Sequence, residues 1–76
     1  GDAAQTLNAV LPQIRALIAA RLARGEPLSH YTRHLLGLFP GVRGAKHYRR
    51  ILSEEARAPG AGIDIFDRAL AAVAPP

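Results

Sequence analysis

Three breaks rich in glycine and proline divide the sequence into four segments, and each segment repeats its apolar residues every three or four positions. The breaks lie at residues 25–27, 39–41 and 58–62. Proline lacks a backbone donor and glycine tolerates left-handed turns, so such runs end helices. Apolar steps of three and four share one helix face, and no segment alternates with the period of two expected of a strand. The sequence therefore predicts an all-α fold, a small bundle of about four helices.

The first two predicted helices span residues 7–24 and 29–38. Pro12 lies inside the first, so that helix either begins near Pro12 or is kinked there. Ser29 is a good N-cap for the second. Their predicted core residues are Leu7, Val10, Leu11, Ile14, Leu17, Ile18 and Leu22, followed by Tyr31, Leu35, Leu36 and Leu38.

The third predicted helix begins at about residues 43–45 and ends near Arg57. The fourth begins near Ile63 and frays at Pro75 and Pro76. Asp64 falls in its first turn, where the helix dipole favours a negative charge. The predicted core residues are Ala45, Tyr48, Ile51, Leu52 and Ala56, followed by Ile63, Phe66, Ala69, Leu70 and Val73.

Length and composition restrict the possible functions. A chain of 76 residues has room for one domain, residues 1–76. It contains no cysteine, which excludes disulfides, thiolate metal sites and a cysteine nucleophile. No apolar run approaches the roughly 18 residues of a membrane span, and no secretory signal is visible, so we expect a cytoplasmic protein. Methionine is absent and Gly1 comes first, which favours an excised fragment.

Positive charge is concentrated in the middle of the chain. Residues 30–50 carry +5, whereas residues 1–29 carry +1 and residues 51–76 carry −2. Like charges spaced three and four apart on a helix repel each other, so a sequence selected only for stability would intersperse glutamates. The asymmetry predicts a polyanionic partner.

Within this basic segment, Arg43, Lys46 or His47, and Arg50 fall on one face of the third predicted helix. Arg33, together with His30 and His34, adds a second ridge from the preceding helix. The alternative is an ordinary solvated face, with Arg50 bridging to Glu54, and Arg49 to Ser53 or a carboxylate elsewhere. We expect Tyr48 to pack in the core and not to stack on a base.

Other candidate sites are weaker. His30 and His34 stand one turn apart, but a zinc site would need further ligands. Glu54 and Glu55 are adjacent and point to different faces, so they do not form a catalytic pair. Amides between Gly41 and Gly44 could bind one phosphate at the start of a helix.

The run TRHLLGLFPGVRGAKHYRRILSE at residues 32–54, continued by EARAPGAGIDIFDRAL, resembles the C-terminal helical domain of bacterial tRNA-dihydrouridine synthases, in the subgroup that acts on tRNA positions 20 and 20a. The similarity covers nearly the whole chain. The sequence departs from the family in having Tyr48 for a tryptophan, Leu35 for a methionine and Arg43 for a proline.

The resemblance implies a division of labour. A complete enzyme of this family has a TIM barrel that holds FMN, NADPH reduces the flavin, and a barrel cysteine donates a proton. This chain has no cysteine and no βα units, so we expect a non-catalytic C-terminal fragment without cofactor that packs beside that barrel and binds tRNA as a monomer. The expected RNA-binding residues are Arg33, His34, Arg43, Lys46, Arg49 and Arg50.

Two other hypotheses remain open. In one, the bundle binds a protein through an exposed apolar patch formed by Leu38, Phe39 and Ile65. In the other, the basic residues bind an anionic membrane, although they are spread over several helices and not concentrated on one amphipathic helix.

Overall fold

The computed structural model describes the backbone of residues 2–73 and the side chains of residues 7–73. Over this part of the chain it consists of four α-helices and contains no strand. The predicted all-α fold with about four helices is confirmed. The predicted fraying at Pro75 and Pro76 lies outside the described residues. The helices are α1 (Asp2–Ala23), α2 (Ser29–Leu35), α3 (Ala45–Glu55) and α4 (Ile63–Ala72).

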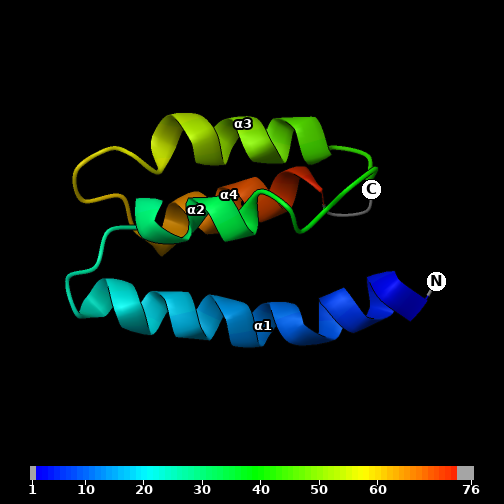
Figure 1. Ribbon diagram of the computed structural model, residues 1–76, viewed down its shortest axis with the longest axis horizontal. Helices are drawn as coiled ribbons and strands as arrows, with labels where there is room; N and C mark the ends of the chain where they lie inside the picture. Colours follow the sequence, from blue (N-terminus) through cyan, green and yellow to red (C-terminus); the bar gives the residue numbers. More distant parts are fainter. Residues whose placement is uncertain (1, 74–76) are drawn as a thin grey trace.

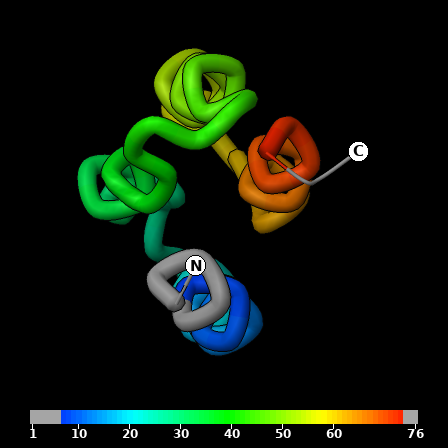
Figure 2. Tube along the Cα trace, turned by 90° about the vertical axis from the view of Figure 1, so that its right-hand side faces the viewer, coloured from blue at the N-terminus to red at the C-terminus, as the bar shows by residue number. Residues whose placement is uncertain are grey.

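The four helices run roughly along one direction (Figure 1). Viewed along this direction, α1 and α3 lie on opposite sides of the bundle, with α2 and α4 between them (Figure 2). α4 packs against both α3 and α1. The arrangement gives each helix one face toward a common centre and leaves the outer faces of α1 and α3 directed away from each other.

One cluster of buried side chains fills the centre, with contributions from every helix. Three members, Leu28, Phe39 and Ile65, are not among the core residues assigned to the four predicted helices. Leu17 was predicted as a core residue, but 57% of its surface is exposed. Its neighbour Ile18 points inward, and successive residues differ by about 100° around a helix, so the predicted stripe is wider than the surface that covers it. The buried cluster comprises Ile18, Leu28, Leu35, Phe39, Ala45, Tyr48, Leu52, Ala56, Ile65, Phe66 and Ala69.

α2 is shorter than predicted, and Ser29 does not cap it. Leu28 occupies the N-cap position without a side-chain hydrogen bond. The amides of His30 and Tyr31 donate to the carbonyls of Pro27 and Leu28 in the preceding turn, at 3.1 and 2.9 Å. Because backbone groups already satisfy these amides, the helix begins without a serine cap.

α1 continues through Pro12 as a single helix, so the alternative in which the helix begins at this residue is wrong.

Gly44 precedes α3 with φ of 87°. A Cβ added at Gly44 would lie 2.1 Å from the carbonyl oxygen of Ala72. Gly44 therefore allows the start of α3 to approach the end of α4 backbone to backbone. α3 begins after it, at Ala45, and ends at Glu55, two residues before the predicted end.

Within the described residues, no helix is both long and apolar enough to cross a membrane.

Candidate nucleic-acid interface

The six predicted RNA-binding residues are all exposed, and they come from three consecutive parts of the chain. Arg33 and His34 lie on α2, and Arg43 lies in the turn before α3. The left-handed conformation of Gly44 separates Arg43 from the helix, so the prediction that Arg43 continues a helix face is wrong. The remaining three residues, Lys46, Arg49 and Arg50, project from α3.

One side of α3 is buried and another carries the charge. Tyr48 and Leu52 are fully buried against the core. Lys46 and Arg50, one turn apart, line a depression of about 370 Å³ together with Gly44 and His47. The structure thus confirms that the basic residues of α3 leave the helix away from its core face.

A second depression lies between α2 and α3, and we call it the α2–α3 groove. It has a volume of about 240 Å³ and brings Arg33 together with Arg57, which follows α3. Arg57 was missed because the sequence places it among the acidic C-terminal residues. Its position four residues after Ser53 and eight after Arg49 was the signal that it continues the same side of α3. The groove is lined by Ser29, Thr32, Arg33, Leu36, Leu52, Ser53 and Arg57.

The arginines between α4 and its neighbours α1 and α3 are ion-paired. Arg15 on α1 donates from Nε and Nη2 to the carboxylate of Asp67 on α4, at 2.7 and 2.8 Å. This contact lowers the pKa of Asp67, chiefly through the hydrogen bonds. Arg68 on α4 forms a similar two-bond pair with Glu55 on α3. These pairs join α4 to both helices that it packs against.

A third pair closes the turn between α1 and α2. Arg21 lies 3.5 Å from the carboxylate of Glu26. The hydroxyl of Tyr31 donates a short hydrogen bond to the same carboxylate. This bond is the main reason why the pKa of Glu26 is lowered and that of Tyr31 is raised.

The basic side differs sharply. Arg50 and Glu54 approach to 3.5 Å with 74% and 63% of their side chains exposed, which confirms the bridge considered in the alternative interpretation. Among the side chains of residues 7–73, Arg33, Arg43, Lys46, Arg49 and Arg57 form no ion pair. We refer to these five residues and Arg50 as the basic face.

The aromatic residues near this face serve the core, as predicted for Tyr48. The Tyr48 hydroxyl donates to the carbonyl of Leu35 at 2.7 Å, and burial raises the pKa of Tyr48. Phe39 meets Tyr48 edge to face with ring centroids 4.9 Å apart. Phe39 and Ile65 are more than 90% buried, so the exposed apolar patch predicted from Leu38, Phe39 and Ile65 is wrong.

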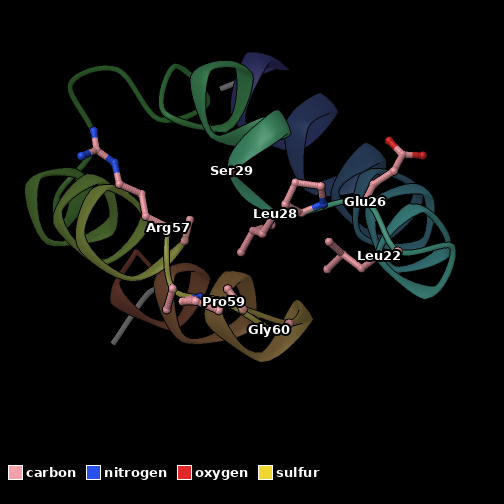
Figure 3. Close-up of a pocket in the computed structure, with 13 residues that line it drawn as sticks. Leu22, Glu26, Leu28, Ser29, Arg57, Pro59 and Gly60 are labelled. Atoms are coloured by element: carbon pink, nitrogen blue, oxygen red, sulfur yellow. The ribbon is translucent and has the colours of Figure 1, made fainter.

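A wider cleft of about 380 Å³ separates the α1–α2 turn from the loop between α3 and α4 (Figure 3). Leu22 and Leu28 lie on one side and Pro59 and Gly60 on the other, while Arg57 extends away from it. Glu26 is the carboxylate at its edge, and it is already held by Arg21 and Tyr31. Within the described residues, no group of three or more His, Asp or Glu side chains is placed to hold a metal ion.

The fold and surface define this chain as a small helical domain with a basic face on which, among the described side chains, only Arg50 has an ion partner. Over 74 residues, 97% of its length, it is 43% identical to the tRNA-dihydrouridine(20/20a) synthase of Yersinia pestis. It is 42% identical to that of Vibrio parahaemolyticus over 64 residues and 46% identical to that of Escherichia coli over 66, or 84% and 87% of the chain. The family resemblance is confirmed: nearly the whole chain is similar to a domain-sized part of tRNA-dihydrouridine(20/20a) synthases.

The match covers only a fraction of those relatives. The chain spans about one fifth of the length of the curated relatives, 20% of the Yersinia protein and 19% of the Escherichia protein. No protein-family model matches the sequence, and no solved structure does.

Proposed function

We propose that this chain is the tRNA-binding domain of a tRNA-dihydrouridine synthase and positions tRNA so that the catalytic part of the same protein reduces a D-loop uridine. The catalytic part would contain the barrel, with FMN and NADPH, and this domain would carry out no chemistry itself. The proposal draws on the names of the relatives and on the chemistry of the basic face. The chain would act as a monomer and would contact the barrel in the complete enzyme.

The observation that carries the proposal is that five of the six cations of the basic face have no ion partner among the described side chains. Arg33, Arg43, Lys46, Arg49 and Arg57 have no carboxylate partner among the described side chains, whereas the arginines between α1, α3 and α4 do. Unpaired like charges repel each other, and the negative charge of a bound polyanion relieves this repulsion. The counterions that the polyanion releases on binding add to the affinity. RNA phosphates supply negative charge along a continuous backbone.

The residue types also fit phosphate contacts. Arginine presents a planar fork that binds phosphate through two hydrogen bonds, and lysine adds a point charge. Contacts to phosphate fix position but do not read sequence. Selection of tRNA would therefore depend on its folded shape and on the geometry between this domain and the catalytic part.

A titration of labelled tRNA at about 50 and 200 mM salt tests the proposal. With four to six phosphate contacts, affinity should fall by roughly two to three orders of magnitude over this range. The paired substitutions Arg49→Gln and Lys46→Gln should weaken binding and flatten the salt dependence. The matched control removes two charges from the other side of the molecule, with Arg15→Gln and Arg68→Gln. Equal losses in both double variants, or binding indifferent to salt, would contradict the proposal.

A further inference from the structure

The α2–α3 groove combines two arginines from different elements with two serines in a repeated spacing. Ser29 precedes Arg33 by four residues on α2, and Ser53 precedes Arg57 by four residues along α3 and the turn that follows. Residues four apart share a side of a helix, so each arginine lies one turn beyond a hydroxyl. The same pair of groups is thus presented twice, once from each wall.

Within the described residues, no group neutralises these arginines. Neither Arg33 nor Arg57 forms an ion pair among the described side chains, and no acidic residue lines the groove. Its floor is apolar, since Leu52 is fully buried and Leu36 is half-buried. Arg33 and Arg57 are both exposed, and with no carboxylate in the groove their charges remain free to attract an anion.

The hydroxyls of the two serines are also available. The third hydroxyl in the groove, that of Thr32, donates to the carbonyl of Leu28 at 3.4 Å and is committed to the backbone. Ser29 and Ser53 are exposed and have no such partner among the described residues. The groove therefore offers two guanidinium forks and two hydroxyl donors, and no carboxylate lines it to compete for them.

We propose that the α2–α3 groove binds a single phosphate group, held jointly by Arg33 and Arg57 with hydrogen bonds from Ser29 and Ser53. A tetrahedral phosphate presents acceptor oxygens in several directions and can meet donors from both walls. A planar carboxylate has only two oxygens, which one guanidinium fork can already occupy. The volume of about 240 Å³ accommodates the group with its water.

This inference rests on the proposed function, because the phosphate is assigned to the backbone of the bound tRNA. It goes further in stating that Arg33 and Arg57, distant in the sequence, act on one phosphate and not on two. Joint action has a measurable consequence. Two residues that share a partner give non-additive effects when both are replaced, whereas independent contacts add.

The test measures tRNA affinity and its salt dependence for the 76-residue chain with Arg33→Gln, Arg57→Gln and both together, after a melting curve confirms that each variant folds. Each single change should weaken binding roughly tenfold and reduce the slope of log affinity against log salt by about 0.7 to 0.9. The double variant should show the same slope reduction and clearly less than a hundredfold loss. Arg33→Lys should be intermediate, because it keeps the charge and loses the fork.

Additive losses, with a slope reduction of about 1.5 in the double variant, would overturn the shared phosphate. If the unmodified chain binds tRNA with the expected salt dependence but Arg33→Gln and Arg57→Gln behave like the control Arg15→Gln, the groove is refuted and the proposed function stands. If the unmodified chain shows no salt-dependent tRNA binding, both proposals fail.

A titration with inorganic phosphate distinguishes a free phosphate ligand from a phosphate of the RNA backbone. Backbone amide resonances of Ser29, Arg33, Ser53 and Arg57 should shift with phosphate and not with chloride at equal ionic strength. Shifts accompanied by unchanged tRNA binding in the variants would assign the groove to a free phosphate and overturn the RNA assignment. Loss of tRNA binding without phosphate shifts would assign the arginines to other parts of the RNA and also contradict the proposal.

Discussion

The two sides of this small bundle use arginine in opposite ways. Where α4 meets α1 and α3, Arg15 and Arg68 are each held by a carboxylate from another helix. Along α2 and α3, the cations of the basic face project into solvent, and among the described side chains only Arg50 has an ion partner, Glu54, at 3.5 Å and highly exposed. The paired arginines connect helices, whereas those of the basic face make no such connection among the described residues.

The difference shows that the positive charge of the basic face lies apart from the contacts that stabilise this fold. Exposed ion pairs contribute about 0–1 kcal/mol each, so the core and its close contacts supply most of the stability on either side. The basic face adds self-repulsion to this balance, and among the described side chains only the exposed contact between Arg50 and Glu54 offsets it. It can therefore be altered with little effect on folding, and the predictions below test that separation.

The largest expected effect is at Gly44, where α3 and α4 approach each other. Gly44→Ala should destabilise the fold by more than about 3 kcal/mol, because a methyl group would overlap the Ala72 carbonyl and alanine disfavours positive φ. Chemical denaturation measures the loss. Gly60→Ala is the matched control: φ there is 78°, but nothing lies within 4 Å of the added Cβ, so the loss should be about 1–2 kcal/mol. Equal losses would show that the close approach is not limiting.

A medium effect is expected at Tyr48, which links α3 to the end of α2 beneath the basic face. Tyr48→Phe should cost about 1 kcal/mol, since the Leu35 carbonyl loses the hydroxyl at 2.7 Å but keeps the amide of Leu38 at 3.2 Å. Denaturant titration measures it. Tyr31→Phe provides a control that should lose less, because its half-buried partner Glu26 keeps Arg21 as a second partner. A neutral result for Tyr48→Phe would contradict the role of this bond in fixing α2.

A smaller effect, of opposite sign on the two sides, is expected from removing single charges. Arg49→Gln should leave the free energy of unfolding unchanged or raise it by a few tenths of a kcal/mol, because it relieves repulsion on α3. Arg15→Gln should lower the free energy of unfolding slightly through loss of the Asp67 pair. Thermal melting of both variants in one buffer compares them. Destabilisation by Arg49→Gln would mean that the basic face supports the fold.

The smallest effect concerns acid. The pKa of Asp67 in the fold lies below its ordinary value of 3.8, so the Arg15 pair stabilises above that pH and the contribution disappears as pH falls through the lowered value. Melting temperature between pH 7 and pH 3 should therefore drop slightly more for the unmodified chain than for Asp67→Asn. Both groups are largely exposed, so salt should reduce the difference. Parallel pH profiles of the two chains would show that the pair of Arg15 and Asp67 does not contribute to stability.

Much of the fold could be predicted from local patterns. The breaks at 25–27 and 58–62 indicated where α1 ends and α4 begins, and Asp64 lies in the first turn of α4 as predicted. Less could be predicted where several neighbours decide the outcome. Leu17 fits the apolar stripe and is exposed, while Leu28, in a turn, is fully buried. Periodicity gives the direction of a side chain but does not show whether another helix covers it.

The candidate site divides in the same way. The concentration of positive charge could be predicted from the sequence, because local spacing alone decides which charged residues are neighbours on one helix. The sequence could not show that Arg57, in an acidic segment, lines a groove with Arg33, or that Phe39 and Ile65 are buried.

By itself, the sequence determined the four helices, the all-α class and the concentration of cations between residues 30 and 50, since these follow from breakers, periodicity and charge along the chain. Only the tertiary structure decided which arginines are neutralised. Arg15 and Asp67 are 52 residues apart, and they meet because α1 and α4 pack together. Arg33 and Arg57 line one groove because α2 and α3 are neighbours. Long-range proximity depends on how helices pack, which no local spacing encodes.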